Sequence, residues 1–403
     1  MDYLIVFVFI GVYLGMILGR LPGLALDRTG VALLGALLLL ATGRISLDGA
    51  WNAVDVPTLA LLFGLMIVSA QFRLGGFYTR LTRRLAAADL PPAGLLALLV
   101  AASGLLSAVL ANDIICLAMA PILIEGCARR HLDPKPFLLA LAAAANVGSA
   151  ATLIGNPQNM LIGQSLHLSF SGYLQTALLP SLLGLGVVWG VVARSFRGRW
   201  TLTLAVPEVP APSFNGWQTG KGVAVLAALM LAFLFTSWPR ELVALAAAAL
   251  LLTSRRTASR SFLSLVDWPL LVLFIALFVV NHGLAASGLL AQALAGVRSA
   301  GVDLADPAWL FAATALLSNL VSNVPAVMLL LPAAEHPLAG PILALASTLA
   351  GNLFIIGSIA NIIVIEQASR FGVTISWREH ARIGVPVTVV TLAMAAGWLW
   401  WLA

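Results

Sequence analysis

The sequence predicts an all-α polytopic membrane protein made of two inverted repeats, each with five spans, a re-entrant hairpin and a broken helix. Three observations lead to this prediction. The chain is 61% hydrophobic and only 9% charged, with a mean hydropathy of +1.01, which is typical of integral membrane proteins. Polar residues gather inside two apolar stretches, 103–165 and 316–367. These stretches match each other at a spacing of about half the chain, which indicates an internal repeat.

The first stretch places amides, a hydroxyl and one acid in an apolar background. A bilayer offers such groups no partner, so they must face protein, water or a bound ion. Gly155-Asn156-Pro157 lies midway along an apolar segment and predicts that a membrane helix breaks there. The polar residues of this stretch are Asn112, Asp113, Asn146, Thr152, Asn156, Gln158 and Asn159.

The second stretch repeats this design. Pro332 follows Asn323 at the spacing by which Pro121 follows Asn112. The segment LALAAAAN at 139–146 resembles LALASTLAGN at 343–352, and GNPQN at 155–159 resembles GSIAN at 357–361. We therefore interpret 1–194 and 220–403 as homologous halves joined by a polar, Pro-rich cytoplasmic linker at 195–219.

Apolar runs define the elements of the first half. A basic amphipathic piece at 74–88 is expected to lie along the interface. The segment 92–127 could form two full spans or a re-entrant hairpin, and the polar tip at Asn112-Asp113 favours the hairpin. The span at 136–166 is expected to break at 155–157. The remaining spans are 3–19, 29–42, 56–72 and 173–194.

The second half follows the same order. Its hairpin covers 307–333 with a tip near Ser322-Asn323, and its broken span covers 341–370 with the break around 357–361. Five crossings per half is an odd number, so the two halves must be inverted relative to each other. The remaining elements are spans at 222–237, 241–253, 268–282 and 383–401, and an interfacial piece at 284–297.

The basic residues set the orientation. With both hairpins re-entrant and the linker in the cytoplasm, only Arg44, Arg240 and Arg298 of the 22 Lys and Arg residues fall outside. This positive-inside bias predicts a multi-pass protein of the bacterial inner (plasma) membrane with both termini external. It also accounts for the net charge of +6 without a nucleic-acid partner. Neither a His-rich or acidic cluster nor a metal motif is present, which argues against an enzyme.

Several motifs resemble the ion transporter superfamily, in particular its arsenite-permease and citrate-carrier-like anion permease branch, which is related to divalent anion:sodium symporters. They are ANDIICLAMAPIL at 111–123, GSAATLIGNPQN at 148–159 and GNLFIIGSIAN at 351–361. The resemblance covers essentially the whole chain. It implies binding sites at the hairpin tips and helix breaks, a transport domain that moves like an elevator against a scaffold, and a homodimer.

The Ser-Asn-Thr hairpin tips of the superfamily correspond to 111–113 and 322–324 here. Both asparagines are kept, as Asn112 and Asn323, but Ala111, Asp113 and Val324 replace one serine and both threonines. These hydroxyls help to hold carboxylate and sodium in the sodium–dicarboxylate branch. Asp113 is thus a coupling residue for a proton or sodium, an N-terminal cap of the second hairpin arm, or both at once.

The predicted site combines the tips and the breaks. Helix N-termini attract anions, whereas carbonyl, amide and hydroxyl oxygens suit sodium, with possible sodium positions near Asn112, Gly155, Asn323 and Gly357. In the alternative interpretation the asparagines only satisfy broken backbone. The predicted substrate- and ion-binding residues are Asn112, Asp113, Asn146, Thr152, Gly155, Asn156, Asn159, Ser322, Asn323, Asn352, Gly357, Ser358 and Asn361.

The predicted function is secondary active transport of a small anion or oxyanion, driven by a sodium or proton gradient, with no cofactor beyond the coupling ion. Two broken helices in inverted repeats favour alternating access over a channel. An arsenite or antimonite extruder and a cation/proton antiporter of the same superfamily are the alternatives.

Overall fold

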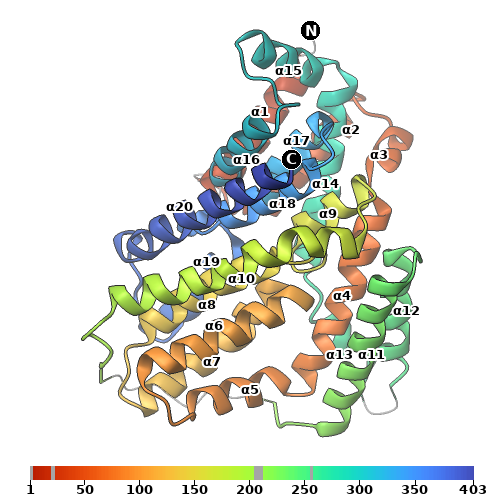
Figure 1. Cartoon of the computed structure of the whole chain (residues 1–403). Helices are drawn as coiled ribbons and strands as arrows, with labels where there is room; N and C mark the ends of the chain where they lie inside the picture. The colour runs from red at the N-terminus through yellow and green to blue at the C-terminus, as the bar shows by residue number, and fades with distance from the viewer. Residues whose placement is uncertain (1–2, 20–22, 204–211, 255–256) are drawn as a thin grey trace.

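The computed structural model describes residues 3–19, 23–203, 212–254 and 257–403. Within these ranges the chain forms twenty α-helices and two short 3₁₀ turns, and its β structure is one isolated bridge between Leu132 and Thr201 (Figure 1). The predicted all-helical class is confirmed. Residues 204–211 of the predicted linker, and Arg20, Arg255 and Arg256 of the charge prediction, lie outside the described residues.

The first half contains ten helices. They are α1 (Tyr3–Leu18), α2 (Arg28–Ala41), α3 (Leu47–Ala53), α4 (Val56–Leu74), α5 (Phe77–Ala86), α6 (Pro92–Val109), α7 (Asn112–Arg129), α8 (Pro134–Ser149), α9 (Pro157–Ser165) and α10 (Phe170–Ser195). The predicted break falls between α8 and α9, and the predicted hairpin is the α6–α7 pair. The short helix α3 was not predicted.

The second half contains ten more. They are α11 (Gly216–Phe235), α12 (Arg240–Leu252), α13 (Ser259–Leu263), α14 (Trp268–Ala286), α15 (Leu289–Ser299), α16 (Pro307–Val321), α17 (Asn323–Leu330), α18 (Ala339–Ala350), α19 (Ile359–Arg370) and α20 (Trp377–Leu402), with 3₁₀ turns η1 (Leu331–Ala333) and η2 (Ile355–Gly357).

Three predicted boundaries need correction. Helix α11 begins at Gly216, inside the predicted linker, because Asn215 caps it by accepting a hydrogen bond from the Gln218 amide. Both breaks begin earlier than predicted, the first directly after Ser149 and the second directly after Ala350, and the second ends before Asn361, which lies in the first turn of α19. The polar helix α13 was also missed, because five residues are too few to show a helical period.

Matching caps show that the two halves use the same local chemistry. Helices α4 and α14 are each 19 residues long, each has proline in its first turn, and each starts after a capping aspartate, Asp55 or Asp267. Each is followed by a left-handed glycine, Gly76 or Gly288, which turns the chain into the next helix. The order and local signals of the ten helices therefore recur.

The helices pack as two groups. The inner group consists of α6–α10 and α16–α20, in which α10 and α20 run side by side over α8 (Figure 1). The outer group consists of α1, α2, α4, α11, α12 and α14, in which α4 packs on α12 and α2 packs on α14. Every residue of α18 and nearly every residue of α8 is buried. The helices that lead into the two breaks thus form the centre of the inner group.

The outer surfaces are apolar. Six described helices, α4, α6, α10, α11, α14 and α20, are long and apolar enough to cross a membrane. Large side chains such as Leu182 and Leu183 on α10 and Val389 on α20 are exposed. A solvent-exposed surface of this kind would be unfavourable in water, and it is the surface expected next to lipid.

Candidate functional site

The two helix breaks are built on one plan. In the first, the Asn159 side chain donates to the carbonyl oxygens of Thr152 (2.9 Å) and Ser149 (3.4 Å). In the second, the Asn361 side chain donates to those of Gly351 (2.9 Å) and Phe354 (3.1 Å). Carbonyls at the end of a helix lack intrahelical partners, and these amides supply them. The amide nitrogens of Asn159 and Asn361 therefore hold the broken backbone together.

The half-helices after the breaks are also capped alike. Asn156 caps α9 by accepting from the Asn159 amide, and Ser358 caps α19 by accepting from the Ala360 amide. The glycine before each cap is required for space. A Cβ on Gly155 would meet the backbone oxygens of Ser149 and Ser107.

Asn146 joins the two halves at the centre of the inner group. Its side-chain oxygen accepts from Ser358 Oγ (2.8 Å) and from Asn112 Nδ2 (3.3 Å). Its side-chain nitrogen donates to Asn352 Oδ1 (2.9 Å) and Asn361 Oδ1 (3.3 Å). Five predicted residues, from α8, the first tip and the second break, therefore share one buried network.

A second buried cluster surrounds Thr348, which accepts from Asn156 Nδ2 (3.3 Å) and Gln158 Nε2 (3.2 Å). The side-chain nitrogen of Asn323 donates to Ser347 O (3.1 Å) and Gly357 O (3.2 Å), and its side-chain oxygen accepts from Gln158 Nε2 (3.1 Å). Gln158 thus ties the second tip to the first break. Its position in GNPQN, inside an apolar segment, was the signal for a site role, although the predicted set omitted it.

The helix starts enclose a small polar cavity of about 30 Å³. It is lined by the first residues of α7, α9, α17 and α19, together with Leu270 of α14. This volume matches one water molecule or one monatomic ion. The lining residues are Asn112, Asp113, Pro157, Gln158, Leu270, Ser322, Asn323, Val324, Ser358 and Ile359.

Asp113 is the one acidic residue that lines this cavity. The N-cap of α7 is Ala111, and α7 has no side-chain cap bond, so the interpretation of Asp113 as a capping residue is wrong. Next to it, Asn112 Oδ1 is buried and has no hydrogen-bond partner among the described residues. A carboxylate and an unpaired amide oxygen are the ligand types of a proton or a hard cation.

A larger cavity of about 260 Å³ adjoins the first one through Asp113, Pro157 and Leu270, which line both. It runs between α4, α7 and α14 and is lined by two further charged residues, Arg73 and Asp267. Arg73 is half-buried, and none of the ion pairs between described residues involves it. Sequence reasoning missed both residues, because each stands at the end of a different apolar span and only the packing brings them together.

The structure assigns the other predicted residues to supporting positions. Thr152 donates to Ala108 O (2.5 Å) and accepts from the Ile154 amide, so it fixes the break rather than facing the cavity. Asn352 Nδ2 is buried and unpaired within the described residues, beneath the Asn146 network. Across the described ranges no three His, Cys, Asp or Glu side chains converge to hold a metal ion.

The CitMHS family, described as citrate transporters, matches residues 5–342. The chain belongs to this family. It is 31% identical to the silicon efflux transporter LSI3 of Oryza sativa subsp. japonica over 93% of this chain and 92% of the relative. It is 22% identical to the putative transporter arsB of Dictyostelium discoideum over 92% and 86%, respectively.

A solved structure shares the fold. The Alcanivorax borkumensis YdaH transporter covers 99% of this chain, which in turn covers 97% of that protein, with a TM-score of 0.58 and 14% identity. Family membership and fold confirm the predicted resemblance, and this CitMHS family member is a membrane transporter and not an enzyme.

Proposed function

We propose that this transporter moves a small anion or oxyanion by alternating access, coupled to a sodium or proton gradient. The observation that carries the proposal is the convergence of four helix N-termini, those of α7, α9, α17 and α19, on one polar cavity. Each N-terminus corresponds to about +0.5 elementary charge. Four of them outweigh the single negative charge of Asp113, so the cavity favours a bound anion.

Asp113 is the proposed coupling residue. An anion that enters beside an ionised carboxylate is repelled, whereas a proton or sodium ion on that carboxylate removes the repulsion. The unpaired Asn112 Oδ1 supplies a second oxygen for the cation. The sodium positions expected near Gly155 and Gly357 are less favourable, because the carbonyls of these residues already accept from Asn112 N (3.2 Å) and Asn323 (3.2 Å).

In this state the inner cavity has room for one water molecule or one monatomic ion, so a polyatomic anion enters it only after the cavity widens. A tricarboxylate such as citrate is much larger than about 30 Å³, and only the adjoining cavity of about 260 Å³ would take it. The names of two relatives refer to silicon efflux and to arsB. Extrusion of a small oxyacid such as arsenite, antimonite or silicic acid is therefore the second candidate function, with a proton rather than sodium as the coupling ion.

The recurring helix order supports inverted repeats, with α6–α7 and α16–α17 as re-entrant hairpins. The inner group is then the transport domain and the outer group the scaffold, and the first slides past the second as an elevator. The distribution of basic residues supports a location in a bacterial inner membrane with external termini. A homodimer through the scaffold completes the proposal, as the family resemblance implies.

Transport by purified protein in proteoliposomes tests this function. Arsenite, silicic acid, arsenate and citrate would be offered in turn, each with a sodium gradient, a pH gradient or neither. Uptake of an anion that needs sodium supports the anion carrier, and pH-driven movement of arsenite or silicic acid supports the extruder. If no gradient accelerates the movement of any of these solutes, the proposed coupled transport is wrong.

A further inference from the structure

Two arginines occupy matching positions on the outer group. Arg28 is the first residue of α2 and Arg240 is the first residue of α12. Helix α2 leads through α3 into α4, just as α12 leads through α13 into α14. Both side chains are half-buried and both donate to backbone carbonyls of the inner group. They therefore bridge the two parts of the molecule that are proposed to move.

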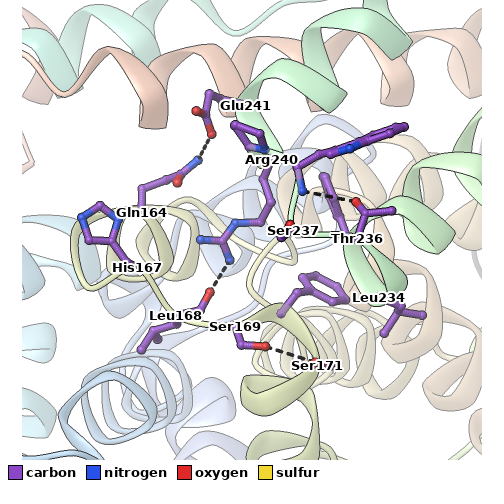
Figure 2. Close-up of a pocket in the computed structure, with 14 residues that line it drawn as sticks. Gln164, His167, Leu168, Ser169, Ser171, Leu234, Thr236, Ser237, Arg240 and Glu241 are labelled. Carbon is purple, nitrogen blue, oxygen red and sulfur yellow. Dashed lines mark hydrogen bonds between the residues drawn. The ribbon is translucent and has the colours of Figure 1, made fainter.

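Arg240 holds the turn that follows the half-helix α9. Its guanidinium donates to Gly163 O (2.6 Å) and to Leu168 O (2.9 Å), and Gln164 donates to the neighbouring Glu241 (3.0 Å) (Figure 2). The Gly163 carbonyl also accepts from the Leu168 backbone amide (3.1 Å), and the planar guanidinium adds charge-assisted hydrogen bonds to this carbonyl and to that of Leu168. These contacts line an open cavity of about 520 Å³ between the α9–α10 and α11–α12 turns.

Arg28 reaches a different point of the other half. Its single contact among the described residues is a long one, from Nη2 to Ile356 O (3.5 Å). Ile356 lies in the break before the half-helix α19, whereas the contacts of Arg240 lie at the end of α9 and just after it. The two arginines thus hold opposite ends of equivalent half-helices.

We infer that Arg28 and Arg240 are alternating latches that hold the inner group in its two end states. In the opposite state Arg28 binds the carbonyl of Ile375, and Arg240 releases Gly163 and Leu168. The equivalence rests on the caps, because Leu168 and Ile375 each precede a capping serine, Ser169 or Ser376. This inference rests on the proposed alternating access.

The geometry also sets the size of the movement. For Arg28 to pass from Ile356 to the end of α19, the inner group must slide by about the length of that helix. At 1.5 Å per residue the 12 residues of α19 give a displacement of about 18 Å. The Gln164–Glu241 contact opens in the process, and Gln367 approaches Thr29 at the equivalent place.

Two cysteine pairs report the two states. The pair Gln164→Cys with Glu241→Cys is in contact in the present state, and Thr29→Cys with Gln367→Cys is its counterpart in the other. Both native cysteines, Cys116 and Cys127, are buried. The measurement is the rate of cross-linking of each cysteine pair in membranes. It is made in an otherwise unchanged full-length chain and in chains that also carry a substitution of Arg28 or Arg240.

Arg240→Ala is expected to slow cross-linking of the Gln164/Glu241 pair and to accelerate that of the Thr29/Gln367 pair, by about tenfold in their ratio, because it removes charge-assisted hydrogen bonds from one end state only. Arg28→Ala is expected to shift the ratio in the opposite direction. Arg240→Lys keeps the positive charge but loses the planar guanidinium that donates to two carbonyls at once, so it should give an intermediate ratio of cross-linking rates.

The inference is overturned if the Thr29/Gln367 pair fails to cross-link in the Arg240→Ala background, or if both alanine variants move the ratio in the same direction. The result is separate from the proposed substrate. If the two alanine variants shift the ratio of cross-linking rates in opposite directions but the protein transports none of the tested solutes, the latch inference is supported and the proposed function is not. If coupled transport is found but neither variant changes the ratio, only the latch inference is refuted.

Discussion

The two breaks and the two hairpin tips differ in an informative way. The breaks are near copies, since Asn159 and Asn361 bind the equivalent carbonyls of their own broken helices. The tips are not copies. Asn112 is followed by Asp113, whereas Asn323 is followed by Val324, and the first tip reaches its break through a backbone amide while the second uses a side chain.

Features that recur in both halves are structural, whereas features found in one half only are candidates for the transport chemistry. A feature that recurs in both halves meets a need that both halves share, namely satisfying broken backbone in an apolar interior. A feature present in one half cannot be required by that need. Asp113 is such a feature, and it faces the cavity without capping its helix. The proposed coupling chemistry therefore lies in the asymmetry of the tips.

Asp113→Asn is the change with the largest expected effect. It removes the ionisable group but keeps the size of the side chain, so gradient-driven transport should fall by more than about 100-fold while the protein remains folded. The check is proteoliposome transport of the identified substrate with and without the coupling gradient. Val324→Asn at the equivalent position of the second tip is the matched control and should retain most transport. Equal losses in both variants would refute a special role for Asp113.

The two glycines of the breaks give the next largest effect. In Gly155→Ala the new methyl group would meet the backbone oxygens of Ser149 and Ser107, whereas in Gly357→Ala the nearest oxygen is Gly351 O at 3.0 Å. Gly155→Ala should therefore lower stability by about 2 kcal/mol and Gly357→Ala by less, because the methyl group at 155 overlaps backbone atoms more closely. Thermal unfolding of the two variants in detergent measures the difference. The reverse order would mean that the first break is the more adaptable one.

Much of the fold could be predicted because the determining signals are local. Composition gave the membrane class, Gly155-Asn156-Pro157 marked the first break, and the order of apolar runs matched the helices. In both halves the preceding helix ends earlier than the glycine motif indicates, α8 at Ser149 and α18 at Ala350, for reasons of packing. Element type follows from residue pattern, but the exact ends follow from tertiary contacts.

The site was only partly predictable for the same reason. The amides at the tips and breaks stand out as polar residues in apolar runs, and the structure gathers them into two buried clusters, one around Asn146 and one around Thr348. Arg73 and Asp267 give no such signal, because charged residues at the ends of spans are common. Which of them borders the cavity depends on how α4 and α14 pack around α7.

Asn159→Ala and Asn361→Ala test the shared plan of the breaks. Each variant removes two hydrogen bonds to carbonyls of the broken backbone, so each should lose about 1–2 kcal/mol of stability. Thermal unfolding in detergent measures both losses, and similar values are expected because the contacts match. Thr391→Ala, which removes a hydroxyl bound within its own helix α20, is the control with a smaller expected loss. A large loss in only one asparagine variant would break the equivalence of the two breaks.

The smallest expected effect is that of Arg73→Gln. Arg73 has no basic counterpart in the second half, where Ala285 occupies the equivalent position before the glycine turn. Removing a half-buried cation from the adjoining cavity should raise KM for an anionic substrate by about threefold and leave kcat nearly unchanged, because it weakens attraction along the approach. Initial rates of uptake at several ionic strengths measure this, and the effect should shrink as salt rises. Arg84→Gln, on the exposed side of α5, is the control. If Arg73→Gln leaves the KM of an anion unchanged at low salt, the adjoining cavity is not the path by which the anion reaches Asp113.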